Sequence, residues 1–208
     1  MDLIIKKLIL VHIMLLLSAC AIKGHKWQNG MNPSQHELGF IIESRNSPVD
    51  SDKLFWSVQS ALPYTNEFEK KKTRDSFDIS VHDNLRNARS VNRIRMYTES
   101  ELAKYDFDKK GFPLKKPIGY LGGYPYSLKI TNPEAIEFLP VDLELAETLQ
   151  KRMIWSAGRK IYFFIELELD DKTERKKQDP KHIVLPARIV KYKAVQMGSD
   201  RTIAESTL

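Results

Sequence analysis

The most regular pattern in the chain is the stretch IYFFIELEL at residues 161–169, in which every odd-numbered position is apolar. The even-numbered positions hold Tyr162, Phe164, Glu166 and Glu168. A period of two residues is typical of a β-strand with one buried face, because successive side chains point to opposite sides of a sheet. We therefore expect residues 161–169 to form a half-buried strand.

The segments on either side of this stretch predict further strands. Residues 182–195 are rich in β-branched and apolar side chains, and Pro186 implies a sheet edge or a bulge because proline lacks a backbone N–H. Residues 170–181 are charged and too short for a crossover helix, so we expect an antiparallel hairpin with an extended loop. Residues 91–97 suit a strand with one wet face, and residues 105–130 suit short strands and turns.

Two segments predict amphipathic helices. Residues 51–61 carry apolar side chains on one side of a helix, and Asp142 can cap a helix over residues 143–153. Residues 66–89 fit a helix but also, around Phe77, a strand, so their state stays open. The sum is an α+β domain with an antiparallel sheet and two or three helices on one face.

The first twenty residues have the layout of a secretory signal. Two lysines precede residues 8–17, which are apolar except for His12, and small residues then lead to Cys20. Ten residues rise about 15 Å as a helix, roughly half of a bilayer core, which is too short for a permanent span. The ending Leu17-Ser18-Ala19-Cys20 resembles the lipobox of bacterial lipoproteins.

This resemblance implies cleavage before Cys20, a diacylglyceryl thioether on its sulfur and acylation of the new amine. It also implies an outer-membrane destination facing the periplasm, because Ala21 is not acidic; the inner membrane and the cell surface stay open. Cys20 is the only cysteine in the 208 residues, so no intramolecular disulfide can form. The alternatives are a chance cysteine in an ordinary secretory leader and a cysteine in a buried N-terminal helix.

Composition divides the chain into four parts. Residues 1–19 form the signal, residues 20–34 a lipidated tether, residues 35–197 a single domain and residues 198–208 a disordered tail. Loss of the two lysines and one aspartate in residues 1–19 changes the formal charge from +6 to +5. So small a charge does not favour nucleic acid as a partner.

Two metal motifs begin in the sequence but are incomplete. The dipeptide that begins at His36 matches the first two residues of the zinc-binding motif His-Glu-x-x-His, but Phe40 occupies the position of the second histidine. The segment that begins with Asp106, Asp108 and Gly111 resembles a calcium-binding loop, but a lysine and a proline occupy two positions that need oxygen ligands. The loop is therefore incomplete as a calcium site. We expect no metal and no cofactor.

Candidate catalytic groups have plainer explanations. Glu166 and Glu168 would lie about 6.6 Å apart on one strand face, inside the window for glycoside hydrolysis, but we interpret them as charges of a solvated strand face. A serine nucleophile could use His82 or His182 as its base, yet no Gly-x-Ser-x-Gly elbow is present. We assign no catalytic residue.

Two clusters could bind a partner. A positive stripe, which could dock on anionic lipids, lipopolysaccharide phosphates or an acidic protein, consists of Arg86, Arg89, Arg93 and Arg95. Exposed rings that could stack on sugars or partner side chains are Tyr120, Tyr124 and Tyr126. A solvated arginine face and a plain hairpin turn are the alternatives. Residues 105–114 resemble a motif of uncharacterised bacterial envelope domains.

These observations favour a non-catalytic function. We expect a membrane-anchored module that binds or assembles another component of the cell envelope, with a protein as its partner. The alternative is a hydrolase acting on cell-wall or envelope glycans.

Overall fold

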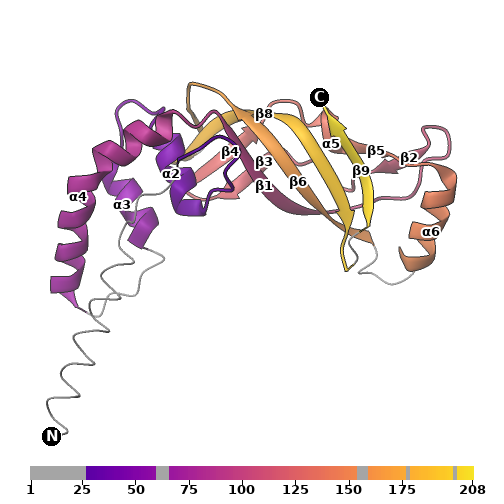
Figure 1. Cartoon of the computed structure of the whole chain (residues 1–208), viewed down its shortest axis with the longest axis horizontal. Helices are drawn as coiled ribbons and strands as arrows, with labels where there is room; N and C mark the ends of the chain where they lie inside the picture. Colours follow the sequence, from indigo (N-terminus) through magenta and orange to yellow (C-terminus); the bar gives the residue numbers. More distant parts are fainter. Residues whose placement is uncertain (1–26, 60–65, 154–158, 177–178, 199–200) are drawn as a thin grey trace, which may run out of the picture.

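The structure is a computed structural model that describes residues 27–59, 66–153, 159–176, 179–198 and 201–208. Its centre is a curled seven-stranded sheet (Figure 1). β6 (Lys160–Leu169) pairs antiparallel with β1 (Arg93–Glu101) on one side and with β8 (Asp179–Gln196) on the other. The half-buried strand predicted over residues 161–169 is confirmed, with its odd-numbered residues buried.

β8 is the strand around which the rest of the sheet is arranged. Along one side it pairs with β6 and then with β7 (Glu174–Lys176). Along the other side it pairs with β4 (Tyr126–Ile130) and then with β9 (Thr202–Thr207). β3 (Tyr120–Gly123) completes the sheet as the partner of β4.

The prediction of a purely antiparallel sheet is wrong at one pair of strands. β4 runs parallel to β8, with Tyr126 beside Ile183 and Ile130 beside Ala187. A long connection separates the two strands in sequence, which a parallel pair requires. The class is therefore α+β, as expected, but with a mixed sheet.

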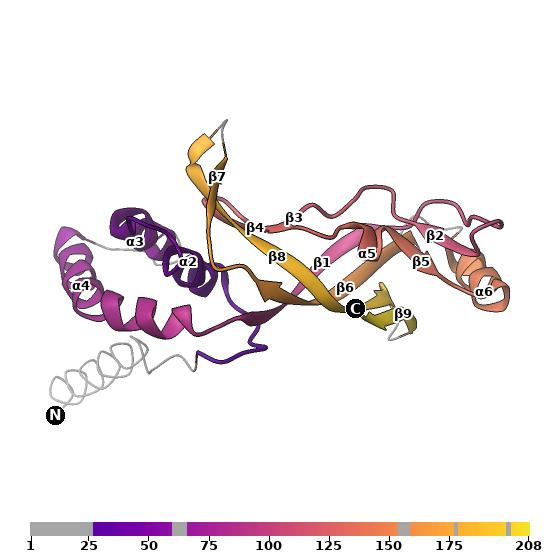
Figure 2. The ribbon, with the colours of Figure 1, turned by 90° about the horizontal axis from the view of Figure 1, so that it is seen from above.

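The helices lie at the two ends of the sheet rather than on one face (Figure 2). α2 (Gln35–Glu43) packs on β3, β4 and β8, and α3 (Ser51–Gln59) and α4 (Glu67–Arg89) pack on α2. We term α2, α3 and α4 the helical end. Toward the opposite end lie β2 (Gly111–Pro113), α5 (Glu134–Glu137), β5 (Phe138–Pro140) and α6 (Leu143–Met153).

Local sequence signals account for these helices. Asp142 Oδ1 accepts a hydrogen bond from Leu145 N (2.8 Å) and caps α6, as predicted. α3 confirms the helix expected from residue 51, although residues 60 and 61 lie outside the described part. α4 settles the open state of residues 66–89, because Asn66 caps a helix that buries Phe77, Val81 and Ala88.

A buried arginine joins the helical end to the sheet. Arg45 is 7% exposed, and its guanidinium donates hydrogen bonds to the backbone oxygens of Ile41 (3.0 Å), Val91 (2.6 Å) and Asp170 (3.0 Å). These oxygens belong to α2, the approach to β1 and the end of β6. Burial, followed by repulsion from Arg89, lowers the pKa of Arg45 to about 10, so the group is charged at neutral pH.

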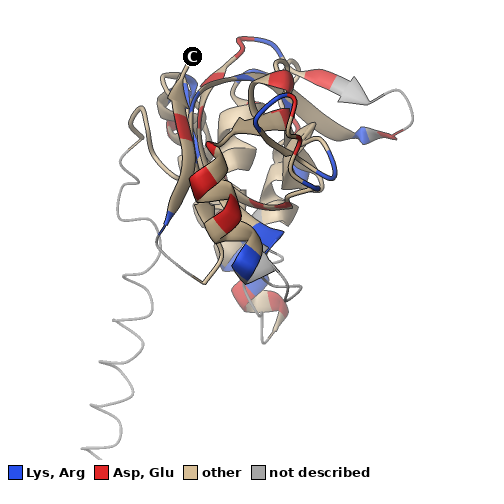
Figure 3. Cartoon of the chain, turned by 90° about the vertical axis from the view of Figure 1, so that its right-hand side faces the viewer, with Lys and Arg blue, Asp and Glu red and all other residues tan. Residues whose placement is uncertain are grey.

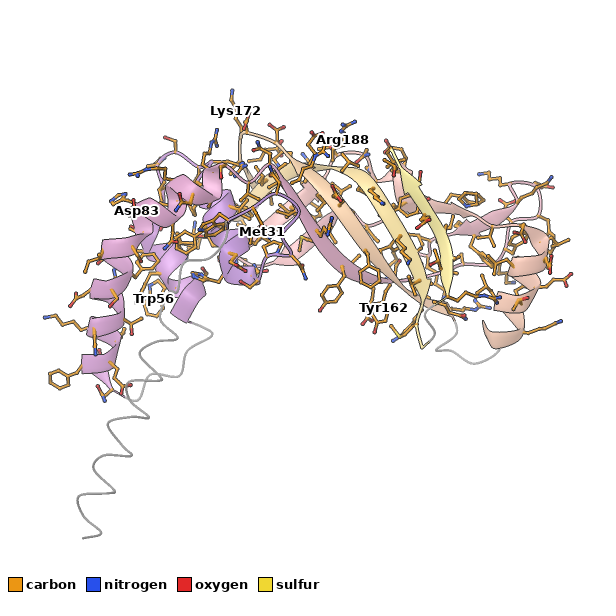
Figure 4. All side chains as sticks on the ribbon, viewed as in Figure 1. Met31, Trp56, Asp83, Tyr162, Lys172 and Arg188 are labelled. Carbon is orange, nitrogen blue, oxygen red and sulfur yellow. The ribbon has the colours of Figure 1, made fainter. Side chains whose placement is uncertain are left out.

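The predicted tether over residues 20–34 is wrong in its second part. Gly30 N donates to Arg93 O (2.7 Å) and Arg95 N donates to Met31 O (2.7 Å), so this segment lies along the edge of β1 (Figure 4). Trp27, Gly30 and Met31 thus contact the domain that was predicted to begin at residue 35, while the predicted signal and Cys20 lie outside the described residues. No helix in the described ranges is long and apolar enough to span a membrane.

The end of the chain is a strand instead of the predicted disordered tail over residues 198–208. β9 pairs antiparallel with β8, with Ala204 beside Ala194 and Glu205 beside Lys193. Ile203 is buried at 5% exposure. The six residues of β9 include few apolar side chains, so the alternation of apolar and polar residues is too short to predict a strand. The strand forms because it pairs with β8.

Pro186 lies within a central strand, and the register of β8 shifts at other residues, so the prediction of a sheet edge or a bulge at Pro186 is wrong. Its carbonyl accepts a hydrogen bond from Asp170 N (2.9 Å) at the end of β6. β7 begins only at Glu174, which leaves a break in the strands on that side of β8. The missing N–H of proline therefore costs no hydrogen bond of the sheet.

Candidate functional site on the outer sheet face

The outer face of β1, β6 and β8 carries six outward-pointing side chains in two neighbouring rows. We term them the outer-face patch, and they are Tyr97, Phe164 and Lys193 in one row and Arg95, Glu166 and Lys191 in the next. Directly opposed residues on neighbouring strands have Cβ atoms about 5 Å apart. Each row is therefore a continuous set of side chains held at fixed spacing by the sheet.

Two aromatic residues of this patch are opposed on neighbouring strands and are exposed. Tyr97 is 62% exposed and Phe164 is 52% exposed. A cavity of about 320 Å³ lies against them, and Asn32 is among the residues that line it. Tyr162 and Arg188, on the same face, mark the ends of the surface (Figure 4). Isolated exposed apolar residues are ordinary, but two neighbouring rings beside a cavity suit a binding surface.

Ion pairs neutralise the acids next to the rings. Arg95 Nε lies 3.5 Å from Glu166 Oε2, and Glu168 lies between Arg188 (2.9 Å) and Arg93 (3.7 Å). The Arg188 guanidinium, with Arg93 beside it, holds the pKa of the Glu168 carboxyl below its usual range. A glycosidase general acid needs a raised pKa, so Glu168 does not suit that role.

Two lysines of the outer-face patch lie opposite acids on neighbouring strands, Lys191 opposite Glu166 and Lys193 opposite Glu205. Among the described residues, Lys191 and Lys193 form no ion pair. On the side of the molecule that carries α6, acidic and basic residues are interspersed (Figure 3). An acidic group on a partner would therefore be complementary to this side of the patch.

The four arginines predicted to form a positive stripe each lie beside an acid. Arg86 and Arg89 belong to the end of α4, while the other two belong to β1. Arg86 pairs with Asp83 (3.4 Å) and Arg89 with Asp171 (3.7 Å). Of the four, Arg95 lines the cavity. The stripe is therefore compensated charge rather than a bare phosphate-binding surface.

The three predicted tyrosines have different environments. Tyr126 is fully buried at 0% exposure and donates a hydrogen bond to Glu43 Oε1 (3.0 Å), so the prediction that it binds a partner is wrong. Burial, followed by the charge of Glu43, raises the pKa of Tyr126. Tyr120 and Tyr124 are 50% and 62% exposed, but they lie at β3, the opposite edge of the sheet from β1.

A serine and a histidine pair between β4 and β8. Ser127 Oγ lies 2.8 Å from His182 Nε2, and the Tyr124 ring packs against the imidazole with centroids 5.7 Å apart. Ser127 is only 2% exposed, so its hydroxyl is not placed to attack a substrate. The other histidine considered as a base, His82, is exposed on α4.

The incomplete metal motifs have structural roles. Asp106 Oδ1 accepts hydrogen bonds from Asp108 N (3.0 Å) and Lys109 N (2.9 Å), which closes a turn of the chain. His36 packs against Phe40 with ring centroids 4.9 Å apart. Within the described ranges, no three His, Cys, Asp or Glu side chains are grouped so that they could hold a metal ion.

Sequence reasoning missed four members of the patch, namely Tyr97, Phe164, Lys191 and Lys193. One signal was available, because Phe164 is aromatic at a position where a solvated strand face is usually polar. The pairing of β1 with β6, which local sequence does not specify, brings Tyr97 beside it.

Comparison with known proteins gives a limited match. Residues 58–152 match a family described as Domain of unknown function (DUF4852), which is less than half of the 208-residue chain. The matched segment includes Arg95 and Tyr97 but ends before β6, so it omits Phe164. No curated protein and no solved structure matches the chain.

Proposed function

We propose that this chain is a lipid-anchored protein of the bacterial cell envelope that binds a protein partner through the outer-face patch. The anchor rests on the lipobox-like ending at Cys20, and Ala21 favours the outer membrane. The binding function rests on one observation, the adjoining exposed rings of Tyr97 and Phe164 beside a cavity. Buried aromatic anchors dominate the energetics of protein interfaces.

The charges around the rings favour a protein over the other partners considered. Arginine binds phosphate through paired N–H groups, but Arg93 and Arg95 are already beside Glu168 and Glu166. The general acid of a glycan hydrolase would need a raised pKa, and the pKa of Glu168 is lowered, so Glu168 does not fit that role. An apolar protein surface with an acidic rim fits the rings together with Lys191 and Lys193.

The anchor is tested by replacing the proposed lipidated residue. In Cys20→Ala, labelling with a radioactive fatty acid should be lost, because no other cysteine is present to form the thioether. A matched control is Ser18→Ala, which keeps the cysteine. Acyl labelling that persists in Cys20→Ala would contradict the anchor.

The binding surface is tested by site-specific crosslinking in intact cells. A photoreactive phenylalanine analogue at position 97 or 164 should give a defined protein adduct, whereas the same analogue at Phe107, which is 70% exposed near the opposite end, should not. Combining the probe with Lys191→Glu and Lys193→Glu should reduce the adduct roughly tenfold, since charge complementarity is reversed. An equal adduct at position 107 would contradict the proposal.

A further inference from the structure

The outward face of α4 carries the two most exposed large apolar side chains of the described chain. Phe68 is 87% exposed and Ile79 is 83% exposed. They are eleven residues apart, which is three turns of helix, so both point to the same side about 16 Å apart along the axis. Neither side chain contributes to the core.

The opposite face of α4 fixes this orientation. Phe77 is 6% exposed and its ring packs against Phe40 of α2 and Phe55 of α3, with centroids 6.2 Å and 5.3 Å away. Arg74, on the same inward side, lies over the Phe55 ring at 4.9 Å. Because these contacts hold one face of α4 inward, Phe68 and Ile79 are directed away from the rest of the molecule.

The polar side chains that share the outward face suit a lipid interface. Lys71 and Lys72 follow Phe68 by three and four residues and are exposed. Long cationic side chains reach phosphate groups while neighbouring apolar side chains enter the acyl boundary. Asp75 also lies on this face and is exposed, so the contact would be shallow and confined to the head-group region.

The path of the chain places this helix close to the proposed anchor. The Trp27 ring packs against Phe40 with centroids 6.0 Å apart, so the described chain starts at the helical end. Seven peptide steps separate Cys20 from Trp27 and span at most about 25 Å. A lipid on Cys20 would therefore hold the helical end, and not the α6 end, against the bilayer (Figure 2).

We propose that the Phe68–Ile79 face of α4 rests on the surface of the phospholipid bilayer, as a second membrane contact beside the lipid on Cys20. This inference rests on the proposed anchoring of Cys20. The contact is confined to the helical end, because α4 lies at one extreme of the long axis of the molecule (Figures 1 and 2). The outer-face patch then stays accessible to a partner in the aqueous compartment.

Spin labels on the full-length protein in native membranes test this contact. Phe68→Cys, Ile79→Cys and the control Phe107→Cys each introduce one thiol, and Cys20 would be unreactive as a thioether. Labels at positions 68 and 79 should be more accessible to oxygen and several-fold less accessible to a water-soluble nickel chelate than the label at position 107.

The other outcomes would overturn the contact. High accessibility of positions 68 and 79 to the nickel chelate, equal to that of position 107, would show a free helix face. Low accessibility to both oxygen and nickel would show a protein partner or a second copy on this face. Failure of the anchor is distinguishable, because wild-type protein would then take up a spin label at Cys20 and leave the membrane fraction.

Discussion

The helical end and the outer sheet face both expose apolar side chains, but they hold them differently. On α4, Phe68 and Ile79 stand three turns apart among exposed lysines. On the sheet, Tyr97 and Phe164 adjoin across two strands beside a cavity and a row of ion pairs. Separated apolar side chains, as on α4, can insert into a fluid lipid surface. Apolar side chains held at fixed positions, as on the sheet, can instead fit a complementary protein surface.

The helical end and the outer sheet face keep their relative positions only while the domain stays folded. Among the substitutions considered, we expect replacement of Arg45 to lower the stability of the domain most. Arg45→Met leaves the buried oxygens of Ile41, Val91 and Asp170 without their donor. We expect a loss of about 3 kcal/mol or more in the free energy of unfolding, measured by urea denaturation.

The matched control for Arg45 is Arg86→Met, since the Arg86 side chain is 79% exposed. It should change stability by less than about 0.5 kcal/mol. Equal stability of the two variants would mean that Arg45 does not join the helical end to the sheet.

The hydrogen bond between Tyr126 of β4 and Glu43 of α2 should make the next largest contribution to the free energy of unfolding. Tyr126→Phe should cost about 1 to 3 kcal/mol, because the buried Glu43 carboxylate loses a donor, while Tyr124→Phe should be neutral. The folded pKa of Tyr126 is raised, so its contribution is fully present below the unfolded pKa of about 10 and is lost at higher pH. The gap in unfolding midpoint between wild type and Tyr126→Phe should narrow above that pH.

The exposed rings should matter for binding and hardly at all for stability. Phe68→Ser and Phe164→Ser should each change the free energy of unfolding by less than about 0.5 kcal/mol, since both side chains point into solvent. Phe164→Ser should abolish the adduct formed from a crosslinker at position 97, and Phe68→Ser should leave it intact. Loss of that adduct in both variants would contradict the claim that only the outer-face patch contacts the protein partner.

We expect the smallest change in stability from the ion pairs beside Tyr97 and Phe164. The lowered pKa of Glu168 means that its stabilising contribution is present above the unfolded pKa of about 4.3 and is lost as the pH falls below it. Wild type should therefore lose slightly more stability than Glu168→Gln on acidification, with Glu99→Gln as the control. High salt should remove the difference, and identical acid profiles in low salt would contradict it.

Much of the fold was predictable where the signal was local. Asp142 and the pattern after it defined α6, and the alternation in residues 161–169 defined β6. The parallel pairing of β4 with β8 was not predictable, because it joins segments far apart in the chain. Nor was β9, whose single buried isoleucine, Ile203, gives no usable period.

The candidate site was less predictable than the fold for the same reason. Tyr124 and Tyr126 are two residues apart in one aromatic run, yet one is exposed and the other buried, because only Tyr126 faces α2. The arginines on β1 were recognised, but their acidic partners on β6 depend on the register between the strands. Burial and charge compensation are thus properties of the pairing of strands, which local composition does not specify.

One measurement tests most directly whether the two regions face different partners. A photoreactive phenylalanine analogue is placed at position 68, 79, 97 or 164 of the full-length protein, irradiated in intact cells, and each adduct is identified by mass spectrometry. We predict phospholipid adducts from positions 68 and 79 and protein adducts from positions 97 and 164. Phospholipid adducts at 97 and 164, or the same protein adduct at all four positions, would contradict the account.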